Sequence, residues 1–154
     1  MQNQYVSFNL SSEQYAIPIQ YVEAIIKMQK LTHMPQAPAY VEGVTNLRGA
    51  VLPVIDLRKR LGLPAEEYNL ETRIIVIQVE EKKIGLIVDA VHAVLTLSSK
   101  QIDPTPALVT RLDSEFISGI AKTDQQLLIL LEISGIFSST PAPAALPRLS
   151  AISR

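Results

Sequence analysis

Two histidines and a few carboxylates are the residues of this chain best suited to acid–base chemistry. His33 and His92 lie far apart, and nothing in the sequence suggests that they converge, so we expect both at ordinary surface or edge positions. The chain contains no cysteine, which excludes disulfides, thiolate nucleophiles and cysteine-based metal sites. The glycines have neither the spacing of a phosphate-binding loop nor that of a nucleophile elbow. The spacing therefore predicts no catalytic constellation.

Two pairs of polar residues recur at equivalent positions of an internal repeat. Asp56 matches Glu132, and Gln20 matches Asp89. A carboxylate repeated in this way typically holds a turn or pairs with an arginine, although two carboxylates can also hydrolyse glycosides. Tryptophan is absent and aromatic residues make up only 5% of the chain, which argues against a sugar site. We predict no catalytic residue, no metal site and no cofactor, so the protein is not expected to be an enzyme.

The composition also argues against two classes of partner. The 14 basic and 15 acidic residues give a net charge of -1, and no basic stripe is interleaved with aromatic residues. A nucleic-acid binder or an anionic-membrane binder needs a basic surface. The N-terminus lacks a secretory pattern, and the longest apolar run, 127–131, is far shorter than the roughly 20 residues that cross a bilayer. We expect a soluble cytoplasmic protein that binds no nucleic acid and does not insert into the membrane.

Residues 41–57 (VEGVTNLRGAVLPVIDL) are better candidates for binding a partner protein than any residues of the chain are for catalysis. The turn 46–49 lies between two apolar runs of strand-like composition, and Gly49 can supply the positive φ that a tight turn needs. Arg48 is the one cationic group of this stretch and a strongly directional hydrogen-bond donor. The sequence leaves open whether Arg48 is a solvated turn residue or a contact for a partner.

The elements that must position this turn occur twice. The segments 5–10 and 15–26 match 74–79 and 84–95, each 69 residues later, and 51–57 matches 127–133 after a gain of about seven residues around 104–115. Each copy offers about five short strands, which favours small barrels over a helical protein. Arg48 itself has no counterpart, because the matching position holds Asp124. A duplicated scaffold with one divergent turn suggests that this turn has acquired a function.

The repeat defines the expected domain organisation. We predict a mainly β fold of two five-stranded barrels, the first over roughly 1–70 and the second over roughly 71–137, with exchange of strands between them allowed. Minor short helices are expected at 57–61 and within 107–115. The tail 138–154 is rich in proline, alanine and serine, so it is expected to be flexible.

An apolar run in each copy is a second candidate for binding. Val22 and Ile25 in the first copy correspond to Val91 and Val94 in the second. If the barrels pack with approximate symmetry, both sets border the seam between them, where an apolar helix could dock. The alternative, that these residues belong to the core, stays open at this point.

The motifs in their order resemble the CheW-like chemotaxis coupling (adaptor) proteins. The resemblance is carried by YAIPI at 15–19, VEAII at 22–26, EGVTNLRGAVLPVIDLR at 42–58, IGLIVDAVHAVL at 84–95 and ISGIAK at 117–122. It extends over about 5–137, and the NLRG turn with its flanking strands is a specific feature. The resemblance implies that the two barrels are SH3-like.

The resemblance also implies a role and a binding surface. Such proteins are not enzymes, and they bridge the cytoplasmic hairpin tip of chemoreceptors to the regulatory domain of a chemotaxis histidine kinase, whose autophosphorylation is thereby controlled. The protein would be a monomer alone and would join a larger membrane receptor array. The receptor tip is expected in a groove between the subdomains, at the positions Val22, Ile25, Gly43, Asn46, Leu47, Arg48, Ile74, Val91 and Val94.

One departure and two alternatives accompany this reading. Relatives often carry an acidic residue where this chain has Ala24, and Glu23 beside it would point to the opposite face of an extended strand. An adaptor of the same fold in a non-flagellar pathway, such as surface motility, is one alternative. A small-molecule-sensing domain is the other.

Overall fold

The computed structural model describes residues 2–104, 116–124 and 126–137, and this part of the chain is mainly β. The first half forms β1 (Gln2–Leu10), β2 (Glu13–Pro18), η1 (Ile19–Tyr21), β3 (Val22–Lys27), β4 (Val41–Leu47), β5 (Ala50–Asp56) and α1 (Leu57–Arg60). The second half forms β6 (Arg73–Val79), β7 (Lys82–Val88), β8 (Ala90–Ser98), η2 (Ser99–Gln101), β9 (Ile102–Asp103), β10 (Ile117–Lys122), β11 (Leu127–Leu131) and α2 (Ile133–Phe137). The predicted fold class is confirmed, as is the short helix after the long strand β5.

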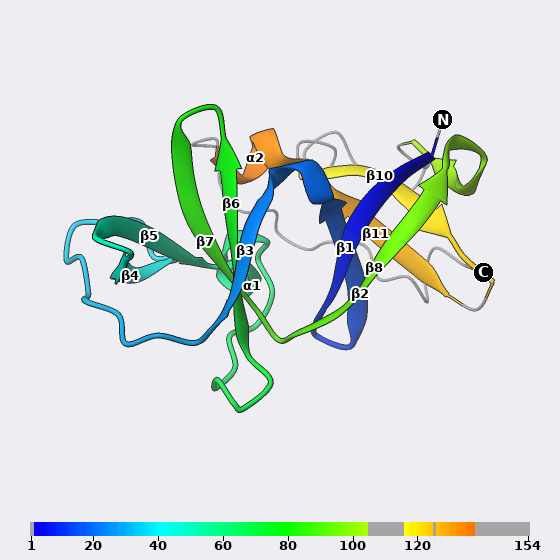
Figure 1. The fold of residues 1–154 in the computed structure, drawn as a ribbon. Coiled ribbons are helices and arrows are strands. Elements are labelled where there is room, and N and C mark those ends of the chain that lie inside the picture. The colour runs from blue at the N-terminus through cyan, green and yellow to red at the C-terminus, as the bar shows by residue number, and fades with distance from the viewer. Residues whose placement is uncertain (1, 105–115, 125, 138–154) are drawn as a thin grey trace.

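The two sheets draw their strands from both halves of the chain (Figure 1). One sheet has the order β8-β1-β2-β11-β10-β9, and the other has the order β3-β6-β7-β5-β4. The β1–β2 hairpin of the first half therefore lies between strands of the second half, and the β6–β7 hairpin lies between strands of the first. The two copies exchange their N-terminal hairpins reciprocally.

The register of the exchange is the same in both directions. Phe8 pairs with Val91, and the equivalent residues Ile77 and Val22 pair in the other sheet. The parallel pairing of β11 with β2 is likewise repeated by that of β5 with β7. The sequence repeat is thus also a repeat of strand pairing, with the partners taken from the opposite copy.

The core consists of one central cluster and a smaller cluster within each sheet. The central cluster combines residues of both hairpins, among them Phe8 and Tyr15 from one sheet and Ile75 and Ile77 from the other. Ile74 belongs instead to the small cluster of its own sheet, with Leu52 and Val54. Strand β6 is a continuous apolar run because both of its faces are buried.

One sheet has an additional strand because of a small difference between the copies. Strand β9 pairs with β10 through two residues, whereas the corresponding contact in the other sheet is a single bridge between Thr32 and Val44. The helix expected within 107–115 and the tail 138–154 lie outside the described residues. Among the described residues, no helix has the length and apolar character needed to span a membrane.

The reciprocal exchange predicts that neither half of the chain folds alone. A fragment of residues 1–70 lacks the strands that flank its N-terminal hairpin, and residues 71–154 lack theirs, so each exposes unpaired edges and half of the central core. We expect each dilute fragment to give poorly dispersed amide NMR signals and an equimolar mixture to recover the dispersion of the intact chain. A dispersed spectrum from either monomeric fragment would show instead that the halves are independent domains.

Candidate functional site

The Arg48 turn is a two-residue hairpin loop between β4 and β5. Leu47 pairs with Ala50, so Arg48 and Gly49 form the loop, and their φ angles are 53° and 86°. Positive φ at both central residues is typical of a type I′ turn. The Asn46 side chain supports the loop, because its Oδ1 accepts a hydrogen bond from the Gly49 amide at 2.9 Å. Asn46 therefore has a structural role in this turn.

Arg48 occupies a backbone position that does not favour arginine. The first loop residue of such a turn is preferentially Asn, Asp or Gly, and a residue with a long side chain there costs roughly 1–2 kcal/mol. The Arg48 side chain is exposed, and no hydrogen bond or ion pair joins it to another residue in the described part of the chain. Its presence is explained neither by the turn nor by a contact within the protein.

The second copy has different residues in the loop at this place. Lys122 pairs with Leu127, and the Thr123 amide donates to the Gln126 carbonyl at 2.9 Å, so residues 123 and 126 face each other as Leu47 and Ala50 do. Between them, residue 125 lies outside the described residues. The divergence between the turns that the sequence predicted is therefore one of residue type, with Asp124 at the position of Arg48.

A hollow of about 140 Å³ lies between the Arg48 turn and the edge strand β3. Arg48, Leu47 and Val51 line it from the turn, and Glu23 and Ala24 line it from β3. Val51 is 73% exposed, in the end of β5 that pairs with β4 but extends beyond the pairing with β7. The turn and β3 thus form one continuous surface with an apolar floor and charged margins.

Glu23 and Ala24 both face this hollow, which corrects the expectation of opposite faces. The pairing of β3 with β6 shifts between Val22 and Ala24, so Glu23 is an additional residue in a β-bulge and strict alternation fails there. Glu23 Oε1 lies 2.8 Å from Lys83 Nζ. The acidic group of this strand is therefore paired with Lys83 rather than with Arg48.

Four predicted groove residues lie on the edge strands of the two sheets (Figure 1). Ile25 on β3 and Val94 on β8 are 42% and 55% exposed. Val22 and Val91, at the start of the same strands, are half-buried and pack against the central core. The structure therefore separates an exposed pair from a pair that also supports the fold.

Two other predicted groove residues are buried. Ile74 is 0% exposed within the core of its sheet, so its side chain cannot line an open groove, and this part of the prediction is wrong. The continuous apolar run of β6 does not reveal which residue faces outward, because none of its central residues does. Gly43 is also buried, with φ of 155°, and a Cβ there would lie 2.5 Å from the Thr32 carbonyl oxygen. Gly43 is required by this close approach.

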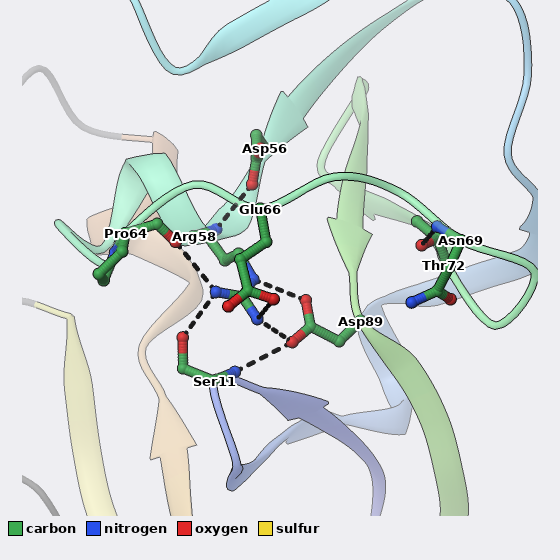
Figure 2. A network of polar contacts seen from close by, with 8 residues as sticks. All are labelled: Ser11, Asp56, Arg58, Pro64, Glu66, Asn69, Thr72 and Asp89. Atoms are coloured by element: carbon green, nitrogen blue, oxygen red, sulfur yellow. Dashed lines mark hydrogen bonds and ion pairs between the residues drawn. The ribbon is translucent and has the colours of Figure 1, made fainter.

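A partly buried polar network around Arg58, which was not predicted from the sequence, connects the two sheets (Figure 2). Arg58 is 6% exposed, and its guanidinium donates from Nε to Asp89 Oδ1 at 2.7 Å and from Nη2 to Asp89 Oδ2. Its Nη1 donates to Ser11 Oγ at 2.8 Å and to the Pro64 carbonyl at 2.9 Å. The hydrogen bonds with Asp89 raise the pKa of Arg58, so this side chain is always charged. The sequence did contain one sign of this network, because Asp89 carries a charge where the equivalent position of the first copy holds the uncharged Gln20.

The buried carboxylate of Asp56, which is 2% exposed, lies beside this network. Asp56 Oδ1 accepts from the Arg58 amide at 3.0 Å and so caps helix α1, and its Oδ2 accepts from the Tyr68 hydroxyl at 3.0 Å. Burial raises the pKa of Asp56 above its usual value, and burial together with the neighbouring Asp56 raises that of Tyr68. Asp56 thus holds a turn, as a repeated carboxylate typically does. His33 and His92 are exposed, as predicted.

Comparison with known proteins places these features in a family. The family model for the CheW-like domain matches residues 4–140. The chain is 40% identical over 140 residues to a probable chemotaxis protein CheW of Rhizobium etli, covering 91% of this chain and 90% of that protein, and 39% identical to the chemotaxis protein CheW of Rhizobium meliloti with the same coverage. The crystal structure of the scaffolding protein TtCheW from Thermoanaerobacter tengcongensis has a TM-score of 0.82 at 37% identity, covering 96% of this chain and 98% of that one.

The two glycines near the turn should respond differently to substitution by alanine. Gly43→Ala should lower the free energy of unfolding by roughly 2–4 kcal/mol, because the new Cβ would collide with the Thr32 backbone. Gly49→Ala should cost only about 1 kcal/mol, because nothing lies within 4 Å of its Cβ position and only the positive φ is unfavourable. Urea denaturation measures both values. Equal losses would show that backbone conformation, not the close approach, fixes Gly43.

Proposed function

The chain belongs to the CheW-like domain family of chemotaxis scaffolding proteins, and we propose that it couples chemoreceptor cytoplasmic tips to a chemotaxis histidine kinase. Members of this family are adaptors and not enzymes. In the proposed assembly, one surface of the protein binds the receptor and another binds the regulatory domain of the kinase. The signalling state of the receptor then controls kinase autophosphorylation through the geometry of the assembly.

The observation that carries this proposal is the exposed Arg48 in an unfavourable backbone conformation. A residue that costs stability at a turn and has no partner among the described residues is best explained by a contact outside the chain. A guanidinium offers directional, charge-assisted hydrogen bonds to a carboxylate or to carbonyl groups. Arg48 would therefore orient the receptor tip on the surface.

The apolar part of the receptor contact is assigned to the two edge strands. The exposed side chains of Ile25 and Val94 would pack against the apolar face of a helical hairpin. Val22 and Val91 would form the base of the groove, where they also contact the central core. Leu47 would contribute beside Arg48, with Asn46 holding the loop, while Gly43 and Ile74 would act through the scaffold and not by contact.

The protein is proposed to work in the cytoplasm, as a monomer recruited to receptor arrays at the membrane. The regulatory domain of the kinase would bind a surface apart from the Arg48 turn, β3 and β8. The alternative of an adaptor in a non-flagellar pathway is not favoured, because the relatives at 40% and 39% identity carry chemotaxis names.

The direct test of the proposed function is reconstitution of the three-component assembly. The protein is mixed with a chemotaxis histidine kinase and a receptor cytoplasmic fragment from the same organism, and complex formation and ATP-dependent autophosphorylation are measured. We expect a ternary complex in which kinase activity differs from that of the kinase alone. Binding to neither component, with both shown to be folded, would reject the proposal.

Substitution of Arg48 should separate binding from stability. Arg48→Asn should leave the thermal midpoint equal or higher, because asparagine accepts positive φ, while receptor-tip affinity falls roughly 10- to 100-fold through loss of a charge-assisted contact. Arg48→Glu should weaken binding further by reversing the charge. Isothermal calorimetry with the receptor fragment and thermal melts provide the two measurements. Unchanged affinity in both variants would mean that Arg48 is a solvated turn residue.

The two edge-strand valines should differ in the same assays. Val94→Asp should weaken receptor binding at least about tenfold with little change in stability, because Val94 is exposed in the free protein. Val22→Asp should weaken binding and also lower the free energy of unfolding by roughly 2–4 kcal/mol, since it places a charge against the central core. If Val94→Asp binds normally, β8 does not line the receptor groove.

A further inference from the structure

We propose that the Arg58–Asp89 pair positions strand β8 relative to strand β3 and thereby sets the width of the receptor groove. The inference rests on the proposed function for the identity of the groove, whereas the positioning itself is a property of the free protein. Arg58 is a positioning residue in this view, because it lies away from the groove residues and acts through Asp89.

The first support is the place of Asp89 in the chain. Strand β7 ends at Val88 in one sheet and β8 begins at Ala90 in the other, so the chain crosses between the sheets at this single residue. Asp89 therefore determines where β8 starts. Val91, at the base of the groove, follows two residues later.

The second support is the set of bonds that hold Asp89 (Figure 2). Arg58 lies in helix α1, directly after β5 of one sheet, and donates hydrogen bonds to both carboxylate oxygens of Asp89 in a bidentate contact. The Ser11 amide, in the β1–β2 turn of the other sheet, donates to Asp89 Oδ2 at 3.0 Å. The Asp89 amide also donates to the Asn9 carbonyl at 3.0 Å. Groups of both sheets thus converge on the crossover residue.

The Ser11 turn shows that this network imposes a conformation. Leu10 pairs with Glu13, so Ser11 and Ser12 form a two-residue loop, and their φ angles are 50° and 69°. Neither residue is the Asn or Gly that such a turn prefers, and unfavourable conformations persist where the surroundings fix them. Here Ser11 is fixed at both its amide and its hydroxyl, by Asp89 and Arg58.

The third support is that the other crossover has no such pair. The chain passes from β2 to β3 through η1, and the residue equivalent to Asp89 is Gln20, which is exposed. The residue equivalent to Arg58 is Ser134, which is also exposed and donates to Glu132 Oε2 at 3.3 Å. The approximate symmetry of the repeat is therefore broken at the start of β8, where the buried Arg58 guanidinium pairs with the partly exposed Asp89.

The spacing of the two strands can be measured without any partner. Because the chain has no native cysteine, spin labels at Lys27→Cys on β3 and Thr96→Cys on β8, both exposed positions, report this spacing by pulsed electron paramagnetic resonance. Arg58→Gln and Asp89→Asn should each broaden or shift the distance distribution. Asp89→Asn keeps the shape of the side chain, so it provides a test if Arg58→Gln fails to fold.

The matched control is Lys59→Gln on the same helix. Lys59 Nζ contacts Glu42 Oε1 on β4, so this ion pair joins two elements on the side of a single sheet. Its loss should leave the distance distribution unchanged, whatever it does to the thermal midpoint. The control separates positioning from a general loss of stability.

Receptor affinity should follow the distance distribution. If only about one molecule in ten retains the native spacing, the apparent affinity of the unlabelled variant for the receptor fragment falls about tenfold. Arg58→Lys keeps the charge but not the bidentate geometry, so it should give values between wild type and Arg58→Gln. Wild-type distances in both Arg58→Gln and Asp89→Asn, with only the melting temperature lowered, would overturn the inference. Failure of the wild-type protein to bind the receptor would reject the proposed function, while the distance measurement would still test the pair.

Discussion

The shared apolar cluster between the two sheets is the constraint on which the rest of the structure depends. Each sheet presents one face of its exchanged hairpin to this cluster, so Phe8 and Tyr15 from one side meet Ile75 and Ile77 from the other. Barrels of this size bury little surface on their own, and the exchange links their stability. Because each hairpin is held between strands of the opposite copy, one sheet cannot open without exposing the core of both.

The exchange also explains why the candidate surface lies on β3 and β8. These strands are the edges next to the exchanged hairpins, and they are equivalent in the repeat, so the duplication produces two similar apolar walls. An edge strand offers side chains on one exposed face without disturbing the core, which suits a binding surface. Similar walls alone would not orient a partner. In the proposed assembly, the divergent features, Arg48 on one copy and the Arg58–Asp89 pair at the crossover, would supply the asymmetry.

The sequence predicted the features that depend on local residue patterns, but it could not predict which strands pair with each other. The offsets of 69 and 76 residues matched every pair of equivalent long strands, because alternation and turn residues are local signals. Hairpin exchange leaves the same apolar pattern whichever copy supplies the neighbouring strand, so only the structure reveals which pairing is formed. The bulge at Glu23 and the inward orientation of Ile74 were missed for related reasons. A bulge has no reliable composition, and a run that is apolar on both faces has no preferred outward residue.

Arg48 and Arg58 both occupy positions that are unfavourable for arginine, and the contrast between them supports the proposed interface role of Arg48. Arg58 is buried, but its donors are matched by Asp89, Ser11 and the Pro64 carbonyl, so the desolvation of its charge is offset within the fold. Arg48 is exposed and costs the turn stability, with nothing in the described part of the chain to offset it. When hydrogen bonds within the fold offset the desolvation of a buried charge, as they do for Arg58, the residue has a structural role. The strain at Arg48, which no contact in the described part of the chain offsets, supports the proposal that Arg48 binds another molecule.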